Sequence, residues 1–220
     1  MLSQEEQVRA TIAFAKEKLG QDRSGHGLDH LHRVARMAQR LAAKSATDPF
    51  IPTIASYLHD TIDEKLFADV DQAQRAVQDF LAGHDFSAAQ TAEIMFIITH
   101  MSYAQTLVGG QTPLPLAGQI VQDADWLDAI GAIGIARAVY YGGKHHQKLY
   151  DPQMPVRTHL TKEDYRDLSQ ETIINHFSEK LFKLKGMLNT PAAKEIAAHR
   201  DQVMHDFVDE FLAEWRGEDE

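Results

Sequence analysis

The chain has 220 residues, of which 44 % are hydrophobic and 25 % are charged, as is ordinary for a globular protein. The formal net charge of −10 argues against a nucleic-acid partner, which needs a basic surface, and the lack of cysteine excludes disulfides, thiolate metal sites and a cysteine nucleophile. No apolar run approaches the roughly 20 residues that span a bilayer, and the polar N-terminal segment is unlike a signal peptide. We therefore expect a cytoplasmic protein with neither a membrane nor a nucleic acid as partner.

Apolar residues recur at helical spacing along most of the chain, and no segment alternates as a strand does. The pattern predicts helices over residues 4–19, 28–44, 49–60, 69–82, 87–100, 115–128, 131–141, 163–188 and 191–216, with a long loop over 142–161. Glycine weakens a helix, so Gly131 and Gly134 indicate close packing. These elements predict an all-α protein of one domain.

The dipeptide His-Asp occurs three times, and its surroundings separate the three copies. His59-Asp60 follows an apolar helical face directly, which places it at the edge of the core. The pair that begins at His84 lies at a helix break, and the pair that begins at His205 lies in an acidic helix. We expect these last two pairs to be solvated.

His30 and Asp125 also lie beside apolar helical stripes, whereas His32 shares a face with polar residues and is expected to face water. A carboxylate at the margin of a core is costly unless it is paired or bound to a metal. Each residue alone is consistent with an ordinary hydrogen-bonded polar group. Two histidines and two aspartates at such margins together favour a metal site.

The set His30, His59-Asp60 and Asp125 resembles the H…HD…D signature of the HD-domain phosphohydrolase superfamily. The segments DHLHRVARMA and LHDTIDE resemble its first two motifs, and VQDADWLDAIGAIGIAR resembles the last motif of a bacterial subgroup of uncharacterised hydrolases. The segment INHFSEKLFKLKGMLNTPAAKEIAAHR is similar to the C-terminal part of that subgroup. The resemblance covers about residues 20–216.

The resemblance implies a single HD-type helical domain over 1–220, with its core over about 20–130 and further C-terminal helices over about 160–216. It also implies that His30, His59, Asp60 and Asp125 bind one divalent ion, for which Mn, Mg, Fe, Co and Ni all suit such ligands.

The implied reaction is hydrolysis of a phosphoester or phosphoanhydride, with a nucleotide as the favoured substrate. Asp63 and Glu64 occupy the place of an acidic pair in related guanosine tetraphosphate hydrolases, so we expect them to position water or accept its proton. Ordinary surface acids are the alternative reading of this pair. Arg33 and Lys180 are expected to bind the substrate phosphate. We favour conversion of nucleoside triphosphates to monophosphates and pyrophosphate over dephosphorylation of monophosphates.

Two other functions stay open at this point. One is a di-iron oxygenase of the HD fold, which would need extra ligands such as His84 or His100. The other is a regulatory module that binds nucleotides without cleaving them. The sequence names neither the nucleobase nor the metal, and it leaves open whether the chain forms a homodimer.

Overall fold

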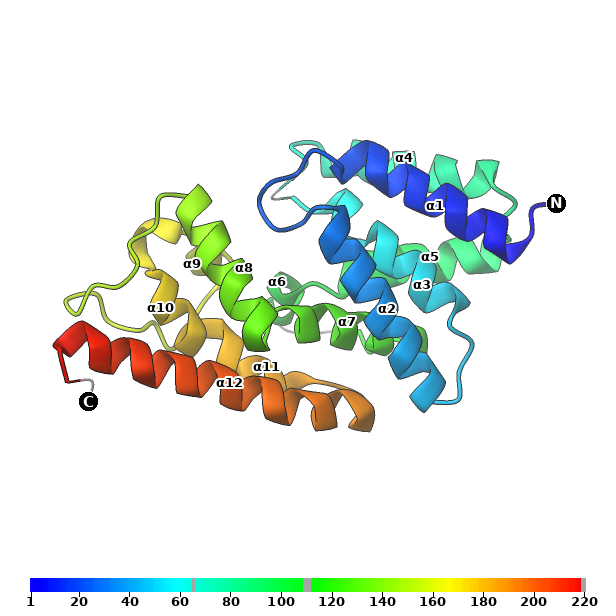
Figure 1. The fold of residues 1–220 in the computed structure, drawn as a ribbon. Helices are drawn as coiled ribbons and strands as arrows, with labels where there is room; N and C mark the ends of the chain where they lie inside the picture. Colours follow the sequence, from blue (N-terminus) through cyan, green and yellow to red (C-terminus); the bar gives the residue numbers. More distant parts are fainter. Residues whose placement is uncertain (65, 109–111, 219–220) are drawn as a thin grey trace. The chain divides into compact units, whose positions relative to one another are not determined.

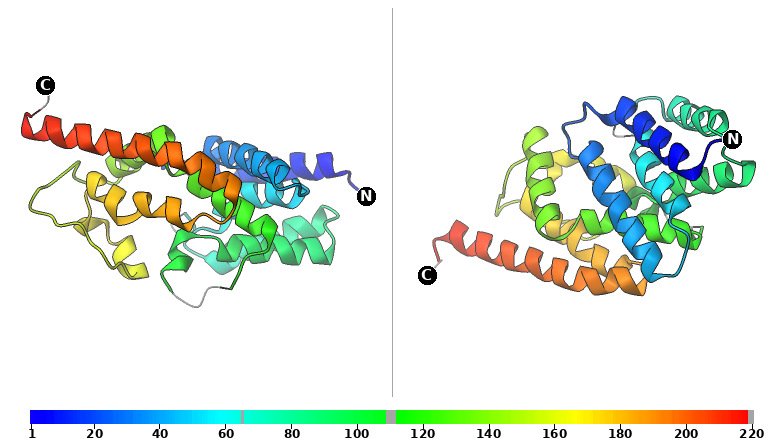
Figure 2. Two further views of the ribbon diagram at one scale, coloured as in Figure 1. Left: turned by 90° about the horizontal axis from the view of Figure 1, so that it is seen from below. Right: turned by 45° about the vertical axis from the view of Figure 1, so that its right-hand side comes forward.

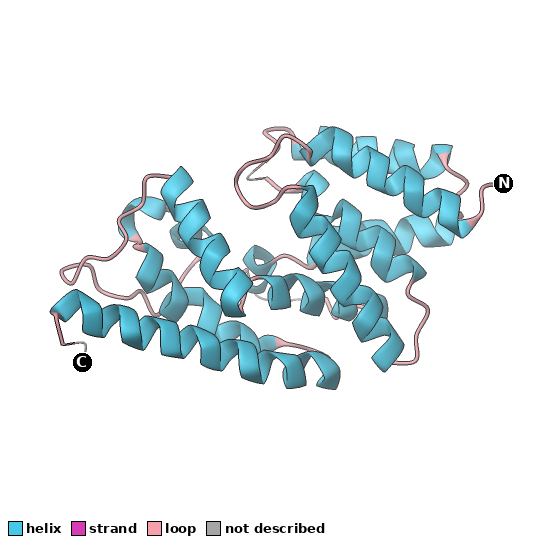
Figure 3. Cartoon of the chain, in the orientation of Figure 1, coloured by secondary structure: helices cyan, strands magenta, loops and turns pink. Residues whose placement is uncertain are grey.

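The computed structural model describes residues 1–64, 66–108 and 112–218. These residues form helices and loops without a strand, so the predicted all-α class is confirmed (Figure 3). None of the helices in these ranges is both long and apolar enough to cross a membrane. The chain divides into two compact units, residues 1–125 and 126–220. A single domain over 1–220 stays a prediction.

Unit 1 is arranged around one buried helix, α3. The unit contains α1 (Gln4–Leu19), α2 (Leu28–Lys44), α3 (Phe50–Leu58), the 3₁₀ turn η1 (His59–Ile62), α4 (Val70–Gly83), α5 (Ala88–His100), α6 (Tyr103–Thr106) and most of α7 (Leu116–Asp128) (Figure 1). Helix α3 contacts α1, α2 and α5. Eight of its nine residues are buried.

The sequence of α3 explains its position, because it is apolar apart from small hydroxyl side chains and one tyrosine. The hydroxyls of Thr53 and Ser56 each donate to a backbone carbonyl one turn earlier, at 2.7 Å. These bonds satisfy polar groups that would otherwise be costly to bury. Helix α3 is therefore a well-packed support for the two residues that follow it, His59 and Asp60.

Unit 2 comprises the end of α7 and the C-terminal elements. These are α8 (Gly131–Lys144), α9 (Lys162–Arg166), the 3₁₀ turn η2 (Leu168–Gln170), α10 (Ile173–His176), the π-helical turn η3 (Phe177–Leu181), α11 (Phe182–Met187) and α12 (Pro191–Arg216). Helix α12 contacts both α8 and α11, and Figure 2 shows it running beside α11. Phe177, Leu184 and Met204 are fully buried in this unit.

The single helix predicted over 163–188 is wrong, because the chain leaves helical geometry between α9 and α10. Asp167 is extended, and its side chain accepts from the backbone N–H of Ser169 at 3.0 Å. Thr172 then caps α10 by accepting from the N–H of Asn175 at 3.0 Å. Aspartate and threonine side chains of this kind compete with the helical backbone and favour helix ends.

The glycines of α8 have the close packing that the sequence predicts. Gly131 has a φ of 77°, and a Cβ there would lie 2.9 Å from the side chain of Arg200. A Cβ on Gly134 would overlap the backbone carbonyl of Ala129. A larger residue at either position would therefore displace its neighbours.

Candidate metal centre

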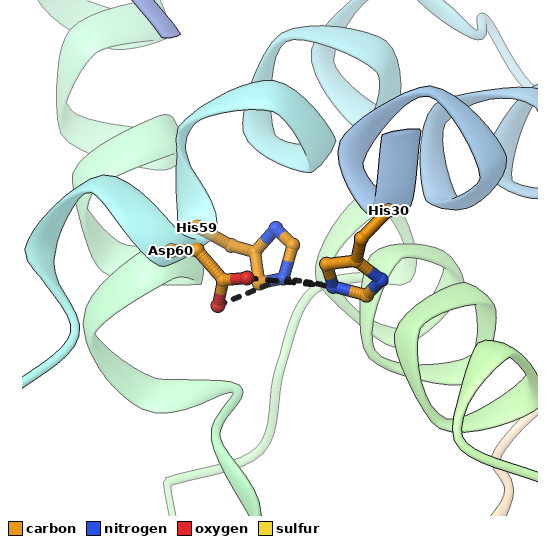
Figure 4. A group of neighbouring side chains, drawn as sticks. All are labelled: His30, His59 and Asp60. Atoms are coloured by element: carbon orange, nitrogen blue, oxygen red, sulfur yellow. Dashed lines mark hydrogen bonds and ion pairs between the residues drawn. The ribbon is translucent and has the colours of Figure 1, made fainter. Parts of the chain in front are cut away.

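Three helical segments of unit 1 bring His30, His59, Asp60 and Asp125 together. His30 lies in the first turn of α2 and is 1 % exposed. His59 and Asp60 begin η1, directly after α3, and both are buried. Asp125 comes from α7, and its side chain is 24 % exposed. Figure 4 shows the first three side chains converging, with the two imidazole rings facing each other beside the Asp60 carboxylate.

The ligand-type atoms of these residues are separated by short distances. His30 Nε2 lies 3.4 Å from His59 Nε2 and 3.4 Å from Asp60 Oδ2. His59 Nε2 lies 3.2 Å from Asp60 Oδ1. Asp125 Oδ1 lies 3.4 Å from His30 Nε2 and 3.7 Å from His59 Nε2. Both imidazole nitrogens thus lie close to each other and to both carboxylates.

Hydrogen bonds to the backbone fix the orientation of two of these elements. His59 Nδ1 donates to the carbonyl of Ser56 at 2.9 Å, which leaves the lone pair of the neutral ring on Nε2, inside the cluster. The side chain of Gln122 donates to the carbonyl of Met101 at 2.9 Å and so ties the middle of α7 to the end of α5. This bond helps to place Asp125, which follows within the next turn.

Both aspartates favour the ionised form. Burial acts to raise the pKa of Asp60, but the nearby imidazoles of His59 and His30 outweigh it and hold the pKa well below its ordinary value. Burial is likewise outweighed at Asp125, whose pKa is lowered by a hydrogen bond from His30 and by the charge of His59. Both carboxylates are therefore ionised and can offer electron pairs to a shared cation.

The donor set fits a divalent ion. Two atoms that each lie about 2.2 Å from one ion, at about 90–110° to each other, are about 3.1–3.6 Å apart. The distances in the cluster match this spacing. Asp60 Oδ2 is also buried without a hydrogen-bond partner among the described residues, which is costly unless a cation lies beside it. The assignment of the four residues as ligands stays a prediction.

The residues predicted to assist the reaction in unit 1 lie close in sequence to these ligands. Asp63 ends η1 and is half-buried, and Glu64 follows it on the exposed surface. Arg33 donates to Asp29 at 2.8 Å, one turn earlier on α2. The roles of these residues in catalysis and in substrate binding stay predictions.

Lys180 belongs to unit 2, where it lies in the π-helical turn η3. Its ammonium donates to the hydroxyl of Tyr165 at 2.8 Å. Its role in binding phosphate stays a prediction.

Four other histidines make contacts outside the cluster. The His84 and His100 rings each bind a backbone carbonyl one turn earlier on their own helices. His205 is exposed and stacks on Phe182 at 3.9 Å. His32, which was expected to face water, is half-buried and hydrogen-bonds the Tyr57 hydroxyl at 2.9 Å.

Sequence reasoning missed one histidine near the cluster, His26. Its ring lies edge-on to that of His30, with the ring centroids 6.2 Å apart. The segment around it, DRSGHG, predicted only a helix break, because glycine and serine obscure any helical period. The spacing of four residues between His26 and His30 was the signal that could have drawn attention to it.

The chain resembles several known proteins along nearly its whole length. No family model matches it. YpgQ of Bacillus subtilis (strain 168), described as an uncharacterised protein, is 35 % identical over 207 residues, which cover 94 % of this chain and 91 % of YpgQ. The structure of YpgQ in complex with ADP matches with a TM-score of 0.76 and 30 % identity, over 96 % of this chain and 95 % of that one.

Two further solved structures match nearly the whole chain. A protein of Lactobacillus plantarum is 47 % identical, with a TM-score of 0.89 and coverage of 99 % of this chain and 100 % of that one. An HD-superfamily hydrolase of Bacillus thuringiensis is 36 % identical, with a TM-score of 0.75 and coverage of 97 % and 99 %. Together with the all-helical fold and the gathered histidines and aspartates, these relatives show that the chain belongs to the HD-domain superfamily of hydrolases.

Proposed function

We propose that this protein hydrolyses a phosphate linkage of a nucleotide, with one divalent ion held by His30, His59, Asp60 and Asp125. The observation that carries the proposal is that Nε2 of both His30 and His59 lies 3.2–3.7 Å from a carboxylate oxygen of Asp60 and of Asp125. The unpartnered Asp60 Oδ2 inside this cluster supports a bound cation. The ADP bound to the related YpgQ supports a nucleotide as the class of ligand.

The ligand types suggest which ions suit the centre. Mixed imidazole and carboxylate ligands favour Mn, Mg, Fe, Co or Ni, and four protein ligands would leave room at such an ion for water and substrate. When bound, such an ion polarises a phosphoryl oxygen and lowers the pKa of water. The protein supplies the orientation of the ligands, because the carbonyl of Ser56 holds the His59 ring and Asp60 follows directly after the buried helix α3.

The chain's own residues then divide the remaining work. In the proposed step, the oxygen of water forms a bond to phosphorus while the bond from phosphorus to the departing oxygen breaks. Asp63 or Glu64 accepts the proton that the water loses, and the departing oxygen takes up a proton from solvent. Arg33 offsets the negative charge of the phosphates, and the same role for Lys180 remains a prediction from the sequence.

Attack at the α-phosphorus of a nucleoside triphosphate is the favoured course, and it releases a monophosphate and pyrophosphate. The chain carries a net charge of −10, so a polyanionic substrate depends on local cations and on the metal for its binding. A triphosphate gives these cations more oxygens to contact than a monophosphate does.

A nucleotide panel tests the proposal. The pure protein is incubated with Mn²⁺ and each nucleoside mono-, di- and triphosphate, and the products are separated by ion-exchange chromatography. We expect pyrophosphate from a triphosphate, loss of this activity in Asp60→Asn, and full activity in the control His205→Ala. Binding without cleavage of any nucleotide would instead support a regulatory module, and two irons per chain without cleavage would support an oxygenase.

A further inference from the structure

Side chains of α2 form hydrogen bonds with side chains of α3 at two levels of this helix pair. His32 Nδ1 lies 2.9 Å from the Tyr57 hydroxyl, and the side chain of Gln39 donates to the Thr53 hydroxyl at 3.3 Å. The α3 partners are buried, Tyr57 at 7 % and Thr53 at 3 % exposed. A later position on α2 thus pairs with an earlier position on α3, so the two helices run antiparallel.

The bond between His32 and Tyr57 lies at the end of the helix pair that carries the candidate metal centre. His32 is two residues after His30 on α2, and Tyr57 is two residues before His59, which directly follows α3. His30 Nε2 and His59 Nε2 are 3.4 Å apart, and Figure 4 shows their rings facing each other. The His32 and Tyr57 rings also pack edge to face, with 5.5 Å between centroids. The two pairs are therefore successive contacts between the same two helical segments.

This bond fixes the register of the helices in a way that apolar packing does not. Helix α2 supplies one of the four predicted ligands, His30, and α3 is the neighbour that it contacts most extensively. Buried apolar side chains hold the helices together without direction, whereas a hydrogen bond restricts both distance and angle. A tyrosine hydroxyl can donate to a histidine nitrogen or accept from it, so the bond forms in either neutral tautomer of His32.

We propose that His32 and Tyr57 are positioning residues of the metal centre. Their hydrogen bond sets the register of α2 on α3 and so holds His30 opposite His59 before an ion arrives. A site that is arranged in advance binds more tightly, because binding then restricts fewer motions of the protein. The inference rests on the proposed metal site, but it concerns the affinity and coordination of the ion and not hydrolysis.

The test compares Tyr57→Phe with the matched control Gln39→Ala, since each removes one hydrogen bond between α2 and α3. Mn²⁺ binding to the metal-free full chain is measured by calorimetry, and the visible absorption of added Co²⁺ reports the coordination geometry. Loss of one hydrogen bond in Tyr57→Phe should weaken Mn²⁺ binding about 3- to 10-fold and alter the Co²⁺ spectrum. Gln39→Ala should keep both wild-type properties, although both variants should lower the midpoint of urea unfolding.

Substitutions at His32 separate the hydrogen bond from the bulk of the ring. His32→Ala should reproduce the loss seen in Tyr57→Phe, and the double variant should bind Mn²⁺ no more weakly than either single variant. His32→Asn keeps a polar group near the position of Nδ1 and should recover most of the affinity. Failure of this recovery would contradict the role of the hydrogen bond.

Wild-type Mn²⁺ affinity and a wild-type Co²⁺ spectrum in Tyr57→Phe would overturn the proposal. Equal losses in Gln39→Ala would also overturn it, because general destabilisation would then explain the effect. A wild type that binds neither ion would end both the proposed metal centre and this inference. A wild type that binds Mn²⁺ but cleaves no nucleotide would end the proposed hydrolysis alone, since the comparison of the two variants needs no turnover.

Discussion

Glu171 makes a buried cluster of polar contacts in unit 2 that should contribute measurably to stability. Its side chain is 4 % exposed and accepts from His176 Nδ1 at 2.9 Å, from Gln147 at 3.0 Å and from Arg157 at 3.2 Å. Burial acts to raise the pKa of Glu171, but these partners, with His176 foremost, lower the pKa to about 2 from 4.5. We predict that Glu171→Gln destabilises the protein and removes this titration.

The magnitude follows from the shift in pKa. A difference of about 2.5 units at about 1.4 kcal/mol each corresponds to about 3.5 kcal/mol at pH 7. The pKa is lower in the folded state than in the unfolded state. The stabilisation is therefore complete above about pH 4.5 and is lost as the pH falls toward about 2. At pH 3, about 1.4 kcal/mol should remain.

Urea unfolding of the wild type and of Glu171→Gln at pH 7 and pH 3, followed by circular dichroism, measures both values. The control Glu210→Gln changes an exposed residue of α12 and should be within about 0.5 kcal/mol of the wild type at either pH. A difference below about 1 kcal/mol at pH 7 would refute the reasoning, and so would a difference that does not shrink at pH 3.

The remaining predictions concern backbone packing, catalysis and helix capping. Gly134→Ala should destabilise the folded protein by about 1–3 kcal/mol in thermal unfolding, because its Cβ would overlap the carbonyl of Ala129. Gly143→Ala in the same helix has open space and should be neutral or stabilising. Equal effects of the two substitutions would contradict this reasoning. Substitution of Asp63 or Glu64 by alanine should lower turnover by about 10²–10⁴-fold while Mn²⁺ stays bound. Wild-type rates in both variants and in the double variant would show that neither residue takes part in catalysis. Thr190→Ala should cost about 1 kcal/mol by urea unfolding, since its side chain accepts from the N–H of Ala193 at the start of α12; no loss would show that the cap is dispensable.

Long helices with a regular apolar stripe could be predicted from the sequence almost to the residue. The predicted ranges 4–19 and 28–44 coincide with α1 and α2. In such segments the burial of one face and the helical period agree, so that no long-range contact is needed to decide the structure.

The segment between α9 and α11 could not be predicted as well, because distant contacts shape it. Arg157 donates to the carbonyls of Asp164 and Asp167 at 2.8 and 3.2 Å, and its guanidinium also binds the buried Glu179. Neither the partners nor the π-helical turn that holds Glu179 has a local signature in the sequence. The apolar period alone therefore predicted one continuous helix.

The candidate site likewise contains residues that the apolar period predicts and a residue whose position depends on its loop. His30, His59, Asp60 and Asp125 were found because each adjoins an apolar helical stripe, and the structure brings all four together. His26 was not found, because it lies in a loop whose conformation depends on hydrogen bonds to Asp22. Periodicity carries no information about a residue placed in this way.

Mn²⁺ titration of the metal-free protein by calorimetry tests most directly whether one divalent ion is bound by His30, His59, Asp60 and Asp125. The wild type and the control His205→Ala should each bind one ion per chain, whereas Asp60→Asn should lose the site and remain folded by circular dichroism. Wild-type Mn²⁺ binding by a folded Asp60→Asn variant, or the same loss in His205→Ala, would contradict the account.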